Sequence, residues 1–312
     1  MITKLAAISL CFAFSFTINV AALAQQSADP AFVATVVHPA YTKNFPRVFF
    51  DEAHNNFHTV AGRSKPFTDL ISNDGYHVVA GRKSFTKESL DTFKVLISVD
   101  ALGAEDVDDE GADRSAFTES ECAVVRDWVK AGGALLLISD PRPFAGATAN
   151  LAKEFGVEMS GNFTKDAANA ENDRPDFIVY AREQHSLLDS PITQGRDDSE
   201  KLNRVIVFAG QSLKGPEGSV AFLQLADSAV ESSGEQAPAA DGPLPQIAAK
   251  GRAQGLAFRF GKGRVVVVGD ADMLSALLGG AAGKEAIGMS YPGVDNRQLV
   301  LNIMHWLSGL LK

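Results

Sequence analysis

The sequence predicts an α/β fold, with a mostly parallel sheet covered by helices on both faces and an irregular, β-rich second half. Between residues 47 and 138, short apolar runs alternate with helical segments. The apolar runs are nearly uninterrupted, as expected for strands that are buried on both faces of a parallel sheet. Of the 312 residues, 46% are hydrophobic, so the chain can bury a large core.

The first half shows clear helix signals between its expected strands. Residues 66–71 have helical spacing and stop at the turn-forming residues 73–75, and a short helix is expected from Thr86. Thr118 and Glu121 have the spacing of a capping box, which predicts a helix that closes at residues 131–133. The strands expected here are 47–50, 76–80, 94–99 and 134–138.

The second half is expected to hold shorter strands and a final helix that begins near Asn296. A three-residue hairpin turn is expected at residues 261–263, and residues 273–278 have a helical pattern. Residues 228–247 are rich in Ala, Gly, Pro and Ser and predict a flexible surface loop. The strands expected here are 204–208, 220–225, 256–260 and 264–268.

The first 24 residues have the pattern of a signal peptide. A positive start is followed by an apolar run and by the small-residue exit Ala22-Leu23-Ala24. The run is shorter than the ~20 residues of a spanning helix, so we expect cleavage and no stable membrane insertion afterwards. The mature protein is then expected in an exported, periplasmic or extracellular compartment. It would comprise a lead segment, residues 25–45, and a single domain, residues 46–312.

The charge and the cysteine count exclude several classes of protein. Acidic residues number 38 against 29 Lys and Arg, and the formal charge of -9 argues against nucleic acid as a partner. Cys122 is the only cysteine that follows the signal peptide, so we expect no internal disulfide. Its helical spacing with Val125 and Val129 predicts a buried, structural thiol.

Several motifs along the chain, taken together, resemble those of one family. They lie at residues 51–59, 74–76, 117–118, 128–133, 136–140, 263–270 and 296–307. In these motifs the sequence is similar to an exported member of the domain-of-unknown-function 4350 group, within the class I glutamine-amidotransferase-like superfamily. The resemblance covers roughly residues 46–311, loosely in the middle, and implies a flavodoxin-like sheet.

Amidotransferase chemistry is not expected, because the nucleophile is missing. True amidotransferases carry a cysteine in a Gly-x-Cys-x-Gly elbow between a strand and a helix. The comparable strand end here reads Leu137-Ile138-Ser139-Asp140-Pro141, with neither the cysteine nor the flanking glycines. A serine hydrolase built on Ser139 and His54 is disfavoured for the same reason. No catalytic residue and no cofactor can be assigned.

Polar side chains gather where the expected strands end, and they form the candidate site. The carboxyl ends of parallel strands share one edge, where such folds bind ligands. We therefore expect the loop at residues 51–58 and the turn at residues 270–272 to face each other across one pocket. The alternative for each aspartate is a capping role. The expected ligand-binding residues, here called the strand-end set, are Asp51, Glu52, His54, Asn55, Asn56, His58, Asp140, Arg142, Asp270 and Asp272.

The favoured function is therefore the binding of a small polar ligand at the carboxyl edge by an exported amidotransferase-like protein. One alternative is a metal-assisted hydrolase in which Glu52 acts as the base. Another is a scaffold for a partner in the cell envelope. The metal would be held by Asp51 or Glu52, His54, His58 and a carboxylate from Asp140 or Asp270.

Overall fold

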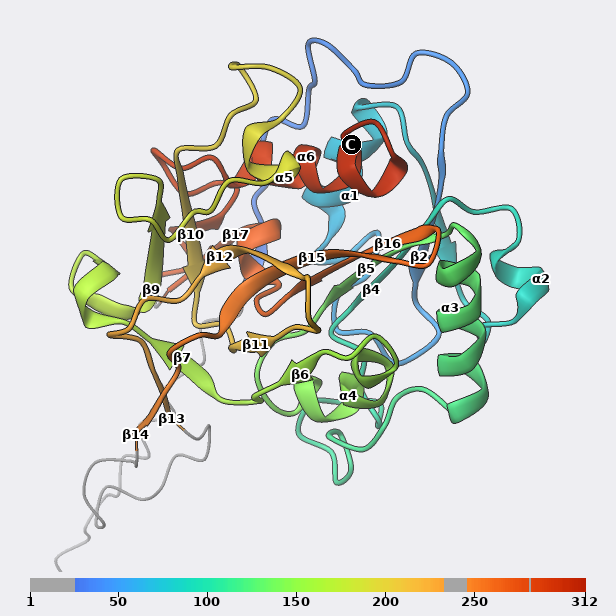
Figure 1. The fold of residues 1–312 in the computed structure, drawn as a ribbon, viewed down its shortest axis with the longest axis horizontal. Coiled ribbons are helices and arrows are strands. Elements are labelled where there is room, and N and C mark those ends of the chain that lie inside the picture. Colours follow the sequence, from blue (N-terminus) through green and yellow to red (C-terminus); the bar gives the residue numbers. More distant parts are fainter. Residues whose placement is uncertain (1–25, 233–245, 281) are drawn as a thin grey trace, which may run out of the picture.

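The structure is a computed structural model. Its centre is a mixed sheet of nine strands (Figure 1). Residues 26–232, 246–280 and 282–312 are described, so the expected signal peptide lies outside the described residues. Five adjacent strands are parallel: β3 (His77–Gly81), β2 (Arg47–Asp51), β4 (Val95–Val99), β5 (Ala134–Ile138) and β16 (Gly263–Val268). Beyond them, the antiparallel pairs involve β15 (Ala253–Phe260), β12 (Val220–Gln224), β11 (Leu213–Lys214) and β6 (Glu158–Met159).

The expectation of a mostly parallel sheet is correct only for the first part of the sheet. A hairpin joins β15 to β16, which makes this pair antiparallel, and the shorter strands continue in the same way. The hairpin turn has two residues, Gly261 and Lys262, instead of three. Gly261 has φ +59, whereas Gly263 belongs to the strand. A Cβ on Gly263 would lie 2.0 Å from the carbonyl oxygen of Val129, so close approach explains this glycine.

Helices cover both faces of the sheet, as the sequence predicts (Figure 1). One face packs against α1 (Lys65–Asn73), α5 (Pro191–Gln194) and α6 (Asn296–Ser308). The other packs against α2 (Lys87–Leu90), α3 (Glu119–Ala131) and α4 (Phe144–Glu154). Successive residues of one strand point to opposite faces, so Phe50 contributes to the first core and Phe49 to the second. Within residues 26–232, 246–280 and 282–312, no helix has both the length and the apolar character to cross a bilayer.

Helix predictions from local sequence are confirmed at α3 but not at residues 273–278, where strand pairing competes. The capping box before α3 is present, because Glu121 N donates to Thr118 Oγ1 and Thr118 N donates to Glu121 Oε2. The helix expected at residues 273–278 is wrong. A 3₁₀ turn, Asp272–Leu274, is followed there by β17 (Ala276–Gly279), which pairs with β18 (Glu285–Gly288). Strand pairing overrides the helical pattern in this segment.

Three small sheets organise the second half and the lead segment. In the lead segment, β1 (Ser27–Ala28) pairs with β17, and Ala40 N donates to Asp74 Oδ1 at 2.8 Å. The described ends of the expected loop at 228–247 are paired strands, and residues 233–245 lie outside the described residues. The other strands are β7 (Phe163–Lys165), β8 (Ala170–Glu171), β9 (Arg174–Ala181), β10 (Arg204–Phe208), β13 (Val230–Ser232) and β14 (Gln246–Ala248).

Cys122 lies in the core between α3 and the sheet, as its spacing predicts. Its side chain is only 2% exposed and packs in the same cluster as Val125 and Val129. Burial, together with the nearby Glu154, raises the pKa of the thiol to about 11. The thiol is therefore protonated and unreactive at neutral pH.

We expect Cys122→Ala to fold and to lose about 1–2 kcal/mol of unfolding free energy, because it removes one small core group. Urea unfolding measures this loss. In the wild-type protein, a chromogenic disulfide reagent should label Cys122 only after unfolding. Rapid labelling of the native protein at pH 7 would contradict the buried, protonated thiol.

Candidate functional site

The parallel strands bring their carboxyl ends to one edge, as expected from the sequence. β4 pairs with β5 up to Val99 and Ile138, and β16 pairs with β5 up to the same Ile138. Acidic residues follow or end the strands, with Asp51 at the end of β2 and Asp100 directly after β4. Two separate groups of side chains form there.

The first group is a buried network centred on His54, here called the His54 network. His54 Nδ1 lies 2.8 Å from Asp51 Oδ1, and His54 Nε2 lies 3.0 Å from Glu121 Oε1. Asp51 Oδ2 accepts hydrogen bonds from Ser98 Oγ at 2.9 Å and from Asn56 Nδ2 at 3.3 Å. Both ring nitrogens of His54 are therefore occupied by protein groups.

The neighbours of His54 favour its protonated form. Burial alone would lower the pKa of His54, but the hydrogen bonds to Asp51 and Glu121 raise it. Burial would likewise raise the pKa of Glu121, but hydrogen bonds from Thr118 and His54 lower it to about 2. The imidazole ring also packs against Phe85 and Phe117, whose ring centroids each lie 4.6 Å from its own. The network thus ties the loop after β2 to the start of α3.

The second group consists of four carboxylates, Asp100, Asp140, Asp270 and Asp272, here called the acid cluster. Backbone N–H groups bind them in series. Asp140 N donates to Asp100 Oδ1 at 2.8 Å, Ala271 N donates to Asp140 Oδ1 at 2.6 Å, and Asp272 N donates to Asp270 Oδ1 at 2.9 Å. The aspartates therefore shape the turns at the strand ends, which is the capping role left open by the sequence.

The acid cluster is short of positive charge. Burial raises the pKa of Asp140 to about 7, and the nearby Asp272 raises it as well, while Arg63 opposes the shift. Burial also raises the pKa of Asp100, Asp270 and Asp272. Asp140 and Asp272 are half-buried, whereas Asp100 and Asp270 are at most 1% exposed. Of the four aspartates, only Asp140 and Asp272 therefore expose an appreciable part of their surface to solvent.

His58 belongs to the edge of the acid cluster but does not neutralise it. Its Nε2 lies 3.6 Å from Asp100 Oδ2, which is beyond hydrogen-bond distance. Burial and the nearby Arg63 lower the pKa of His58 to about 3, so the ring is neutral at pH 7. Asp100 Oδ2 is buried and has no hydrogen-bond partner among the described residues.

The remaining members of the strand-end set lie outside both groups. Glu52 accepts from Val60 N and from Arg82 Nε, so it fixes its own loop. Asn55 and Arg142 are exposed. The structure thus separates the strand-end set into a closed network, an acid cluster and a few surface residues.

Two residues of the site have no signal in the sequence. Gln26 Nε2 donates to Asp272 Oδ2 at 2.7 Å, and Arg63 Nη1 donates to Gln26 Oε1 at 2.6 Å. The Arg63 guanidinium also lies 4.4 Å from the ring centroid of Phe57. Sequence reasoning missed Gln26 and Arg63 because neither follows one of the strands expected in the parallel sheet. They bring the lead segment and the loop before α1 to the carboxyl edge.

The geometry offers neither a metal centre nor an activated nucleophile. In the described part of the chain, no group of three or more His, Cys, Asp or Glu side chains is arranged to hold a metal ion. His54 and His58 lie in different groups, so the ligand set considered from the sequence is not brought together. Ser139 is fully buried, and its hydroxyl donates to the Asp140 carbonyl at 3.3 Å. Its hydroxyl therefore cannot attack a substrate from solvent.

The fold defines an α/β protein with a mixed sheet between two helical layers. No protein-family model and no curated protein sequence matches the chain. Among solved structures, the mmIFT52 N-terminal domain is similar, with a TM-score of 0.56 and 16% identity over 84% of this chain and 97% of that chain. This likeness shows the fold alone.

Two further solved structures match with lower scores. Cytoplasmic protein STM1381 from Salmonella typhimurium LT2 has a TM-score of 0.46 and 12% identity over 84% of this chain and 99% of that chain. A ThuA-like protein from Bacteroides uniformis has a TM-score of 0.44 and 11% identity over 89% and 95% of the two chains. Because both TM-scores are below 0.5, no function is inferred from these two structures.

We expect His54→Ala to destabilise the protein by about 3–5 kcal/mol, because it leaves two buried carboxylates without their shared partner. Urea unfolding at pH 7 measures the loss. His77→Ala is the matched control, since His77 is exposed on β3, and its cost should stay below about 0.5 kcal/mol. Equal losses in the two variants would contradict a structural role of the His54 network.

The acid cluster predicts that stability falls as the pH rises. Because the folded pKa of Asp140 is raised to about 7, the folded state binds more protons than the unfolded state between about pH 4 and pH 7. Its stabilising contribution is complete below pH 4 and is lost as the pH rises through 7. Asp140→Asn should remove this term, so its stability relative to wild type should rise by about 1–3 kcal/mol between pH 4 and pH 8.

Urea unfolding across this pH range tests the prediction. The control is Asp108→Asn, because Asp108 is exposed and the substitution makes the same change of charge. Curves for Asp140→Asn and wild type that run parallel would contradict the raised pKa.

Proposed function

We propose that this chain is an exported amidotransferase-like protein of the domain-of-unknown-function 4350 group that binds a small polar ligand at the carboxyl edge of its sheet. Export is supported by the pattern of residues 1–24, and the group by the motifs in the sequence. The five parallel strands are the part of the sheet in which the flavodoxin-like arrangement is proposed.

The observation that carries the proposal is the charge imbalance of the acid cluster. Asp140 and Asp272 are half-buried and have raised pKa values, and Arg63 reaches Asp272 only through Gln26. Carboxylates in this state gain from any group that donates hydrogen bonds to them. The ligand is therefore a molecule rich in donors, carrying hydroxyl or ammonium groups.

Binding without group transfer is favoured because the groups needed for catalysis are absent from the described edge. Cys122 is buried in α3 with a pKa raised to about 11, and Ser139 is buried without a histidine partner. The metal-assisted alternative needs imidazole and carboxylate ligands that converge, and the two imidazoles of the strand-end set lie in separate groups.

Thermal unfolding in the presence of donor-rich probes tests the proposal. At pH 8 at least one of glucose, glycerol and ethylenediamine should raise the melting temperature saturably, since a ligand of the folded state stabilises it. The affinity should fall below pH 7, where Asp140 becomes protonated. Asp272→Asn should weaken binding by about tenfold or more, because it removes a partly buried acceptor charge.

The control is again Asp108→Asn, which should bind as wild type does. Two outcomes would contradict the proposal: no saturable shift with any of the three probes, or an equal loss of affinity in Asp272→Asn and Asp108→Asn.

A further inference from the structure

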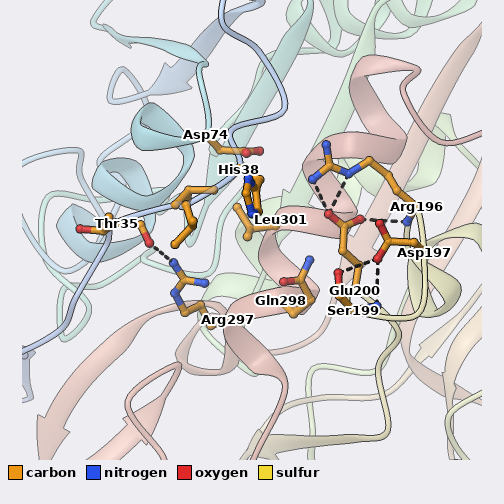
Figure 2. Close-up of a pocket in the computed structure, with 12 residues that line it drawn as sticks. Thr35, His38, Asp74, Arg196, Asp197, Ser199, Glu200, Arg297, Gln298 and Leu301 are labelled. Atoms are coloured by element: carbon orange, nitrogen blue, oxygen red, sulfur yellow. Dashed lines mark hydrogen bonds and ion pairs between the residues drawn. The ribbon is translucent and has the colours of Figure 1, made fainter.

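A cavity of about 440 Å³ lies away from the carboxyl edge, beside α6 (Figure 2). It is bounded by the lead segment at residues 35–38, by the loop at residues 196–200 and by the first turns of α6. Asp74, which also lines it, comes just before β3, so this wall lies at the amino end of the parallel strands. The cavity is thus separate from the acid cluster.

The two buried acids of this cavity already have partners. Glu200 accepts from Arg196 Nε at 2.7 Å and from Arg196 N at 2.8 Å. Asp74 is fully buried, and its two oxygens accept from Ala40 N at 2.8 Å and from His305 Nε2 at 2.7 Å. Neither carboxylate is available to attract a cation.

Arg297 is the side chain of the cavity whose charge lacks a close partner. It is half-buried, and its Nη2 donates to the Thr35 carbonyl oxygen at 2.6 Å. Among the described residues, no Asp or Glu forms an ion pair with its guanidinium, although Asp74 lines the same cavity. Burial lowers the pKa of Arg297, and the nearby charge of Asp74 opposes this shift.

We propose that this cavity binds a short-chain monocarboxylate, whose carboxylate group pairs with the open donors of Arg297. The planar fork of a guanidinium matches a carboxylate in a two-point hydrogen bond. Val36 and Leu301 line the same cavity and provide apolar surface for a short alkyl chain.

The far wall limits the ligand to one negative charge. Asp197 lies beside Arg196 on the side opposite Arg297 (Figure 2). A hydrogen bond from Ser199 lowers the pKa of Asp197, so it is ionised at pH 7. A second carboxylate on the ligand would approach this charge, and like charges repel. A dicarboxylate of similar length should therefore bind more weakly.

Titration of the protein with sodium propionate, at an ionic strength held constant with sodium chloride, tests the proposal. We expect saturable binding by calorimetry or by NMR chemical shifts, and weaker binding of sodium succinate. Arg297→Gln should weaken propionate binding by about tenfold or more, because it removes the charged fork. Arg259→Gln, an exposed arginine on β15, makes the same change of charge and should bind within about twofold of wild type.

A second variant covers the case in which Arg297→Gln fails to fold, since Arg297 also holds the lead segment through Thr35. His38 is exposed at the cavity, and His38→Glu places a carboxylate beside the ligand. It should weaken propionate binding by about tenfold, while His77→Glu on β3 should not. The proposal is overturned by non-saturable binding, by native-like affinity in a folded Arg297→Gln or in His38→Glu, or by equal losses in the controls. Because the acid cluster plays no part in this cavity, the outcome is independent of the function proposed above.

Discussion

Five parallel strands have their carboxyl ends at one edge of the sheet, and four of these ends are occupied or followed by an aspartate: Asp51, Asp100, Asp140 and Asp270. Asp51, Asp100 and Asp270 are almost fully buried, and Asp140 is half-buried. Moving an ionised carboxylate out of water costs several kcal/mol unless a counter-ion or hydrogen-bond donors compensate for it. The way in which each carboxylate is compensated determines what the edge can do.

Asp51 is compensated by hydrogen bonds from side chains, chief among them His54. His54 stands between Asp51 and Glu121, two carboxylates that are 70 residues apart in sequence. Glu121 uses Oε2 for the capping box of α3 and Oε1 for His54 and for Phe85 N. One glutamate thus closes the first turn of a helix and anchors the loop after β2, so the position of α3 depends on the His54 network.

The acid cluster is compensated mainly by backbone N–H groups, and the result can change its charge. N–H donors favour the ionised form of a carboxylate, but each aspartate also repels the others. Burial then raises the pKa of Asp140 into the neutral range, where ordinary aspartates are fully ionised. The same edge therefore contains a closed hydrogen-bonded network and a cluster in which the pKa of Asp140 is raised to about 7.

The sequence predicted those features that depend on neighbouring residues. Continuous apolar runs placed the strands from β2 to β5, and the Thr118–Glu121 pair placed the start of α3. Features that depend on distant residues were not predictable in the same way. Residues 276–278 of the expected helix at 273–278 instead belong to β17, which pairs with β18. The partners of His54 could not be inferred, because Glu121 contacts it from α3, in another layer of the fold.

The same division explains why the candidate site was only partly predicted. Strand direction alone placed Asp140 and Asp270 at one edge, since that follows from the parallel pairing of β5 and β16. Strand direction could not show that Asp51 belongs to the His54 network and Asp140 to the acid cluster, because this depends on the partners that each carboxylate has in three dimensions. Nor could it locate Arg63 or Gln26, whose side chains reach the edge from segments without regular structure at those positions.

The charge balance differs between the two ends of the sheet, and the two binding proposals depend on this difference. At the carboxyl edge, acids outnumber the nearby cation Arg63, so an incoming donor is favoured. Near the amino ends, Glu200 is paired with Arg196, and Asp74 with His305. Arg297 donates to a backbone carbonyl and forms no ion pair in the described part of the chain, so an incoming hydrogen-bond acceptor is proposed there. The net charge of -9 hides this difference, because it sums over the whole surface. Both binding proposals therefore rest on local pairing of charges and not on the total charge.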